Sequence, residues 1–95
     1  MSLQIPNQKK IIDHYGTFEQ MFVWMEECSE LVQAVSKIHR SGIDYVTKDH
    51  LIEEIADVLI CIEQMKEIYD ITDDNINQKI YYKALRQKER MERES

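Results

Sequence analysis

The chain has 95 residues, which allows one small domain, and its formal net charge is −6. This charge argues against broad binding to nucleic acids or anionic membranes, because both attract positively charged surfaces. Two glycines and one proline leave little material for turns, so the composition favours helices. A chain of this size buries a limited fraction of its surface, and we expect a second subunit to complete the core.

The sequence also carries signals of cellular location. No apolar run approaches the ~20 residues that span a bilayer, and residues 1–6 lack the basic start and apolar core of a secretory signal. We therefore expect no membrane partner and a cytoplasmic location with reduced thiols. Cys28 and Cys61 do not have the spacing of a zinc site, and we interpret both as small buried hydrophobic residues.

Two helices are predicted in the N-terminal half. The first covers residues 7–15 and ends at Gly16, after which Thr17 is the expected N-cap and Gln20 completes a capping box. The second continues to about Arg40, where a serine and a glycine end it. Its apolar residues recur on one face at helical spacing: Phe18, Met21, Phe22, Met25, Cys28, Leu31, Val32, Val35 and Ile38.

Two more helices are predicted in the C-terminal half. The first runs from about Asp49 to Tyr69, and the loop 70–73 offers caps for the second, from roughly 73 to 93. No segment shows strand alternation, an internal repeat or low complexity. We therefore predict an all-α bundle with two long antiparallel central helices and flanking helices. Its surplus apolar surface would be covered by homo-oligomerisation.

Acidic side chains interrupt the apolar face of the helix predicted from Asp49. That face is formed by Leu51, Ile52, Ile55, Val58, Leu59, Ile62, Met65 and Ile68. Glu54 and Asp57 fall within it, and burying an unpaired carboxylate costs several kcal/mol. No lysine or arginine lies between Leu51 and Met65 to offset that cost, so a divalent metal is the simplest compensating charge.

A second group of acids lies on the helix before it. Glu26, Glu27 and Glu30 are three or four residues apart, so their side chains converge. If the two helices pack side by side, these acids face Glu54 and Asp57. Hard oxygen ligands of this kind suit Mg²⁺ or Mn²⁺, and magnesium takes substrate phosphates as further ligands. The pattern therefore predicts a site for a metal and a triphosphate.

The acids also have other interpretations. Glu26 and Glu53 lie away from the densest apolar arc, where ordinary solvated acids are equally expected. A di-iron centre in a helical bundle uses Glu-x-x-His pairs, and the sequence contains none. Covalent catalysis is not indicated, because neither Ser29 nor Cys28 has a histidine at helical spacing.

The last predicted helix carries a basic stripe. Lys79, Lys83, Arg86 and Arg90 are spaced so that all four share one face. In an acidic protein this stripe either pairs with the acidic helices or meets an anionic ligand, and both interpretations stay open. Lys79 is the residue that we most readily assign to a phosphate.

Two motifs connect these residues to a known family. The stretch Glu26-Glu27-Cys28-Ser29-Glu30-Leu31-Val32-Gln33-Ala34 and the stretch Glu54-Ile55-Ala56-Asp57-Val58-x5-Gln64 occur in this order. Together they resemble the MazG-like nucleoside triphosphate pyrophosphohydrolases of the all-α NTP pyrophosphatase superfamily, especially its short phage and Gram-positive members. The resemblance implies one domain over residues 1–95 with a core at about 17–90.

The resemblance also implies roles for individual residues. The expected magnesium ligands are Glu27, Glu30, Glu54 and Asp57, and Glu26 would bind a further metal or orient water. Lys79 matches a phosphate-facing lysine, with Lys83 and Arg86 as further candidates. The implied reaction is hydrolysis of a nucleoside triphosphate, between its α- and β-phosphates, to a nucleoside monophosphate and pyrophosphate. Family members assemble as homodimers or homotetramers.

The sequence says less about which residues contact the nucleobase than about which residues hold the metal. Trp24 and Phe22 are candidates to stack on a nucleobase, although aromatics on a long amphipathic helix are usually core residues. Gln20 lies two turns before Glu27 on a similar face, where it could contact ligand or serve the capping box. Two alternative functions remain: phosphoribosyl-ATP pyrophosphohydrolase of the same superfamily, and a non-catalytic helical dimerisation or interaction module.

Overall fold

The computed structural model describes residue 6 and residues 8–95, and within them the secondary structure is entirely helical. The helices are α1 (Gln8–Tyr15), α2 (Thr17–Ser41), α3 (Tyr45–Tyr69) and α4 (Asp73–Glu94). The all-α prediction is confirmed, while position 7 of the first predicted helix lies outside the described residues. None of the described helices is long and apolar enough to cross a membrane.

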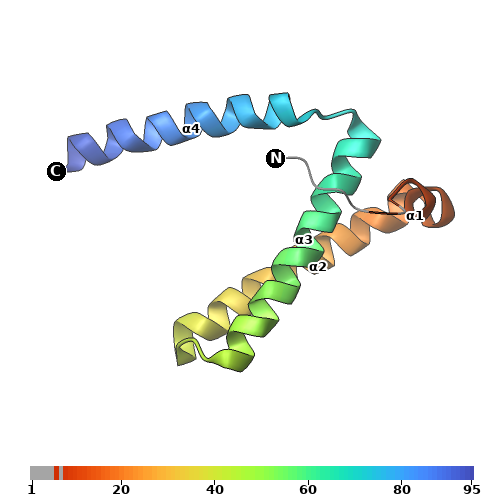
Figure 1. Ribbon diagram of the computed structural model, residues 1–95, viewed down its shortest axis with the longest axis horizontal. Coiled ribbons are helices and arrows are strands. Elements are labelled where there is room, and N and C mark those ends of the chain that lie inside the picture. The colour runs from red at the N-terminus through yellow and green to blue at the C-terminus, as the bar shows by residue number, and fades with distance from the viewer. Residues whose placement is uncertain (1–5, 7) are drawn as a thin grey trace.

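The helices α2 and α3 pack against each other along their length. Each has 25 residues, and Figure 1 shows them side by side and running in opposite directions. The short helix α1 contacts both of them at the end of the pair opposite the α2–α3 connection. By contrast, α4 leaves the end of α3 and extends away, and within the described chain its backbone packs against none of α1, α2 or α3.

The start of α2 differs from the prediction. Gly16 is the N-cap with a φ of 84°, a conformation open to glycine, and no side chain caps this helix. Thr17 is the first helical residue, so the predicted capping box of Thr17 and Gln20 is wrong. Gln20 instead points into the protein, where it is buried.

The start of α3 was also predicted incorrectly. The helix begins at Tyr45, four residues before the predicted Asp49, because Asp44 and Thr47 form a capping box. The Asp44 carboxylate accepts a hydrogen bond from the Thr47 amide at 2.8 Å, and the Thr47 hydroxyl accepts one from the Asp44 amide at 2.8 Å. The predicted caps for α4 are confirmed, since Thr72 forms the equivalent box.

The chain by itself builds a small core. The buried hydrophobic residues of the described chain are Trp24, Ala34 and Cys61, and the buried polar residues are Gln20, Thr47, Glu54 and Gln64. Large apolar side chains of α2 stay in solvent, including Phe18 at 70% exposure. Cys28 is exposed, so the prediction that both cysteines are buried is wrong for this residue.

A buried amide ties α2 to α3. The Gln64 side-chain oxygen accepts hydrogen bonds from the Gln20 amide at 3.0 Å and from the Trp24 indole N–H at 2.8 Å. The Trp24 ring also lies edge-on to Tyr69, with 6.2 Å between ring centroids. Because one acceptor satisfies two buried donors, sliding α2 along α3 would leave polar groups unpaired. This Gln64 junction therefore fixes the register of the two helices.

Replacing Gln64 with alanine should lower the free energy of unfolding by roughly 2–4 kcal/mol, because two buried donors lose their acceptor and a cavity remains. The control is Glu67→Ala on the exposed side of α3, which should change stability by less than about 0.5 kcal/mol. Urea unfolding at fixed protein concentration, followed by Trp24 fluorescence, measures both. Equal midpoints for the two variants would show that the junction does not hold the helices.

Candidate active site

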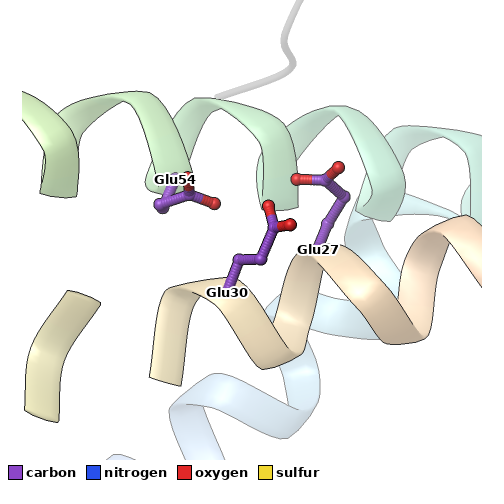
Figure 2. A group of neighbouring side chains, drawn as sticks. All are labelled: Glu27, Glu30 and Glu54. Atoms are coloured by element: carbon purple, nitrogen blue, oxygen red, sulfur yellow. The ribbon is translucent and has the colours of Figure 1, made fainter. Parts of the chain in front are cut away.

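Three glutamates from two helices meet between α2 and α3. Glu27 and Glu30 extend from α2 and Glu54 from α3, and Figure 2 shows their carboxylates turned toward one another. One oxygen from each lies within 4.8 Å of the others. Ligand oxygens on opposite sides of a magnesium ion are about 4.2 Å apart, so small side-chain rotations would bring this trio around one ion. We refer to these three residues as the acid cluster.

Two oxygens of the acid cluster are buried without a partner. They are Glu27 Oε2 and Glu54 Oε2, and Glu54 is only 6% exposed. Within the described chain no lysine or arginine forms an ion pair with the cluster, and the imidazole Nε2 of His50 lies 3.9 Å from Glu54 Oε1. Leaving carboxylate oxygens buried and unpaired is costly. Their chemistry fits a hard divalent cation such as Mg²⁺ or Mn²⁺.

The carboxylates also repel one another. Burial, followed by the charges of Asp57 and Glu30, raises the pKa of Glu27 to about 7. Burial and then the charge of Glu30 raise the pKa of Glu54, while the nearby His50 acts in the opposite direction. Asp57 therefore lies close enough to act on Glu27. A bound cation would relieve both the burial cost and the repulsion.

The remaining predicted site residues lie in three different settings. Glu26 is exposed on α2 and falls outside the acid cluster. Gln20 and Trp24 are buried with their donors engaged at the Gln64 junction. The basic residues of α4 are exposed and stand apart from the acids of their own chain, because α4 does not pack against α2. This last set comprises Lys79, Lys83 and Arg86.

A hollow next to Glu54 is lined by two basic residues that were missed in the sequence. Lys37 and His50 line a hollow of about 240 Å³ together with Ala34, Val46 and Thr47. Since His50 approaches Glu54, this hollow lies next to the acids. The signal available in the sequence was the spacing of His50 and Glu54, four residues apart on one helix.

Comparison with known protein families agrees with the geometry. The profile of the MazG nucleotide pyrophosphohydrolase domain matches residues 17–91. The chain belongs to this family. Searches of curated proteins and of solved structures gave no match. The matched region contains the whole acid cluster, and MazG-type enzymes generally use a divalent metal. Membership supports a hydrolase that acts on nucleotides.

The raised pKa of Glu27 makes the metal-free protein sensitive to pH. Since this pKa is about 7 in the fold and 4.5 ordinarily, the folded state binds more protons between these values. In EDTA, the melting temperature should therefore fall as the pH rises from 5 to 7, and level off above about 8. Glu27→Gln removes this ionisation, so its melting temperature should depend less on pH. The expectation fails if both proteins show the same slope.

Proposed function

We propose that this protein hydrolyses nucleoside triphosphates, either ribo- or deoxyribonucleotides, to nucleoside monophosphate and pyrophosphate. The observation that carries the proposal is the pair of buried, unpaired oxygens on Glu27 and Glu54. They belong to a convergent cluster inside the region that matches the MazG family. We propose a single domain over residues 1–95, with its catalytic core at about residues 17–90.

The proposed cofactor is Mg²⁺, with Mn²⁺ as a substitute. Glu27, Glu30 and Glu54 would hold it, and Asp57 would complete the ligand set beside Glu27. When bound by these residues, a divalent cation would neutralise phosphate charge and lower the pKa of a bound water. Glu26, exposed beside the cluster on α2, would orient that water or bind a further metal. Water attacks phosphorus at the α–β anhydride, the bridging P–O bond breaks, and a proton passes to solvent.

Basic residues would hold the phosphates. Lys37 and His50 line the hollow next to Glu54, so they are placed to contact a triphosphate bound at the cluster. Lys79, Lys83 and Arg86 provide a second group of cations on α4.

An apolar hollow is the proposed base site. It has a volume of about 230 Å³ and is lined by Met21, Trp24, Met25, Cys28 and Met65. The hollow shares α2 with the acid cluster, since its residue Cys28 directly follows Glu27 in the sequence. The Trp24 ring would contact the base, while Gln20 would hold that ring through Gln64. This arrangement would let the Gln64 junction serve both stability and recognition.

We further propose a cytoplasmic homodimer or homotetramer without nucleic-acid or membrane partners. The exposed apolar side chains of α2 and α4 support self-association, because a stable monomer would bury more of them. Phosphoribosyl-ATP hydrolysis in the same superfamily is the competing enzymatic function. A non-catalytic helical module is the competing function of another class.

The proposal predicts magnesium-dependent release of pyrophosphate from at least one canonical or modified NTP or dNTP. Glu54→Gln should reduce this release by at least about 100-fold, because it removes a buried ligand of the metal. The matched control is Glu53→Gln, which changes an exposed neighbour on the same helix and should retain activity within about twofold.

Each result has a distinct meaning. Release that stops in EDTA and in Glu54→Gln, but not in Glu53→Gln, supports the proposal. Turnover of phosphoribosyl-ATP alone would favour the competing enzyme. No release from any nucleotide, by a protein that is folded, would favour the interaction module.

A further inference from the structure

Sulfur-containing side chains gather at one place on the helix pair. The chain has five methionines and two cysteines. Three of these methionines and one of the cysteines line a single hollow of about 230 Å³, together with Trp24. They are Met21, Met25, Cys28 and Met65. We refer to this space as the sulfur hollow, and the proposed base site uses the same space.

Two helices bring these side chains together. Met21, Met25 and Cys28 follow one another at spacings of four and three residues, so they share one face of α2. Met65 comes from α3, directly after Gln64, whose side-chain oxygen accepts two hydrogen bonds from α2. The Gln64 junction therefore places Met65 at the level of the α2 residues that line the hollow. The hollow is thus open to sulfur atoms from both helices.

The side chains of the sulfur hollow are not core residues of this chain. Met21 is 41% exposed and Met25 is 59% exposed, and Cys28 is also exposed. A methionine that only fills a core is buried, so packing within the chain does not account for this cluster. Methionine has three rotatable bonds, so an exposed methionine can turn its sulfur toward a ligand.

The ligand atoms of the sulfur hollow differ in kind from those of the acid cluster. No charged side chain lines the hollow, so it offers no carboxylate oxygen to Mg²⁺ or Mn²⁺. Thioether and thiolate sulfurs are soft ligands that suit Cu(I). Zinc sites use cysteine, histidine and carboxylates rather than methionine. A set of three thioethers and one thiol therefore favours Cu(I).

We propose that the sulfur hollow is a soft-metal site, separate from the acid cluster, which binds Cu(I) through the sulfur atoms of Met21, Met25, Met65 and Cys28. Copper keeps its oxidation state: each methionine sulfur donates a lone pair, Cys28 binds as the thiolate, and its proton passes to solvent. The inference does not rest on the proposed function, because it requires neither the acid cluster nor a nucleotide. An ion in this hollow would occupy the proposed base site and inhibit the proposed hydrolysis.

Silver(I) is a suitable probe, because it is a soft monovalent ion like Cu(I) and is not oxidised in the assay. The protein is titrated in chloride-free buffer with excess Mg²⁺. Binding is followed by the fluorescence of Trp24, the single tryptophan, which lines the hollow. Quenching should saturate at one ion per chain, and Cu(I) offered by a chromogenic chelator without oxygen should transfer in the same ratio. No quenching or no transfer would overturn the inference.

The methionines are tested without changing the shape of the hollow. Met25→Leu/Met65→Leu keeps apolar side chains of similar volume, so the fold should be retained. Its affinity for Ag(I) should fall at least about tenfold, because two sulfur ligands are lost. The matched control is Met91→Leu, which removes an exposed methionine of α4 and should change the affinity by less than about twofold. Equal losses in both variants would contradict the inference.

The thiol needs a control of its own, because an exposed cysteine can bind soft metals by itself. Cys28→Ala should weaken Ag(I) binding. Cys61→Ala should not, since Cys61 is 2% exposed and does not line the hollow. If Cys28→Ala abolishes binding while Met25→Leu/Met65→Leu binds as tightly as the wild type, a lone thiol holds the ion and the inference is wrong.

A second measurement locates the ion without fluorescence or activity. Labelling the methionine methyl groups with ¹³C gives an NMR signal for each methionine. Ag(I) should shift the signals of Met21, Met25 and Met65 and leave that of Met91 in place. Unchanged signals from the three hollow methionines would reject the site.

The inference and the proposed function can fail separately. Ag(I) binding with these shifts, in a protein that hydrolyses no nucleotide, would support the soft-metal site and reject the proposed function. Hydrolysis by a protein that binds neither Ag(I) nor Cu(I) would support the function and overturn the soft-metal site.

Discussion

Buried negative charge between α2 and α3 is the main constraint on this structure. Glu54 is 6% exposed, and two other carboxylates approach it from the facing helix. In the absence of a cation, such a cluster destabilises the helix pair, and the raised pKa of Glu27 and Glu54 expresses that cost. The Gln64 junction and the Asp44 capping box hold the two helices in place despite it. The fold thus holds together a cluster whose burial cost and repulsion a bound cation would offset.

The acid cluster was predictable because its residues break a pattern. Glu54 and Asp57 interrupt an apolar face, and Glu27 and Glu30 share one turn of a second helix. The spacing of apolar residues predicts which segments are helices. Where each helix begins and ends depends on single hydrogen bonds. The early start of α3 was missed because Asp44 and Thr47 were not recognised as a reciprocal cap. Both cap residues were visible in the sequence.

Other features required three dimensions. Gln20 had an obvious local use as a capping residue, yet its amide bonds to a side chain 44 positions away in the sequence. The exposure of Cys28 depends on how few side chains a single chain packs over α2. The corner between α3 and α4 includes an ion pair of Lys66 with Asp73, which the helical pattern does not contain. Long-range contacts and turns of this kind are not encoded in periodicity.

The separation of acids and bases has a chemical consequence. A lysine packed beside the acid cluster within one chain would pair with Glu54 in the absence of substrate and compete with the metal. Within the described chain, the cluster has only His50 nearby, and the lysines of α4 stand apart. In the proposed function, the acids would therefore stay open to a divalent cation, and the basic stripe would stay open to phosphate. A nucleotide at the proposed site would offer phosphate oxygens both to that cation and to basic residues.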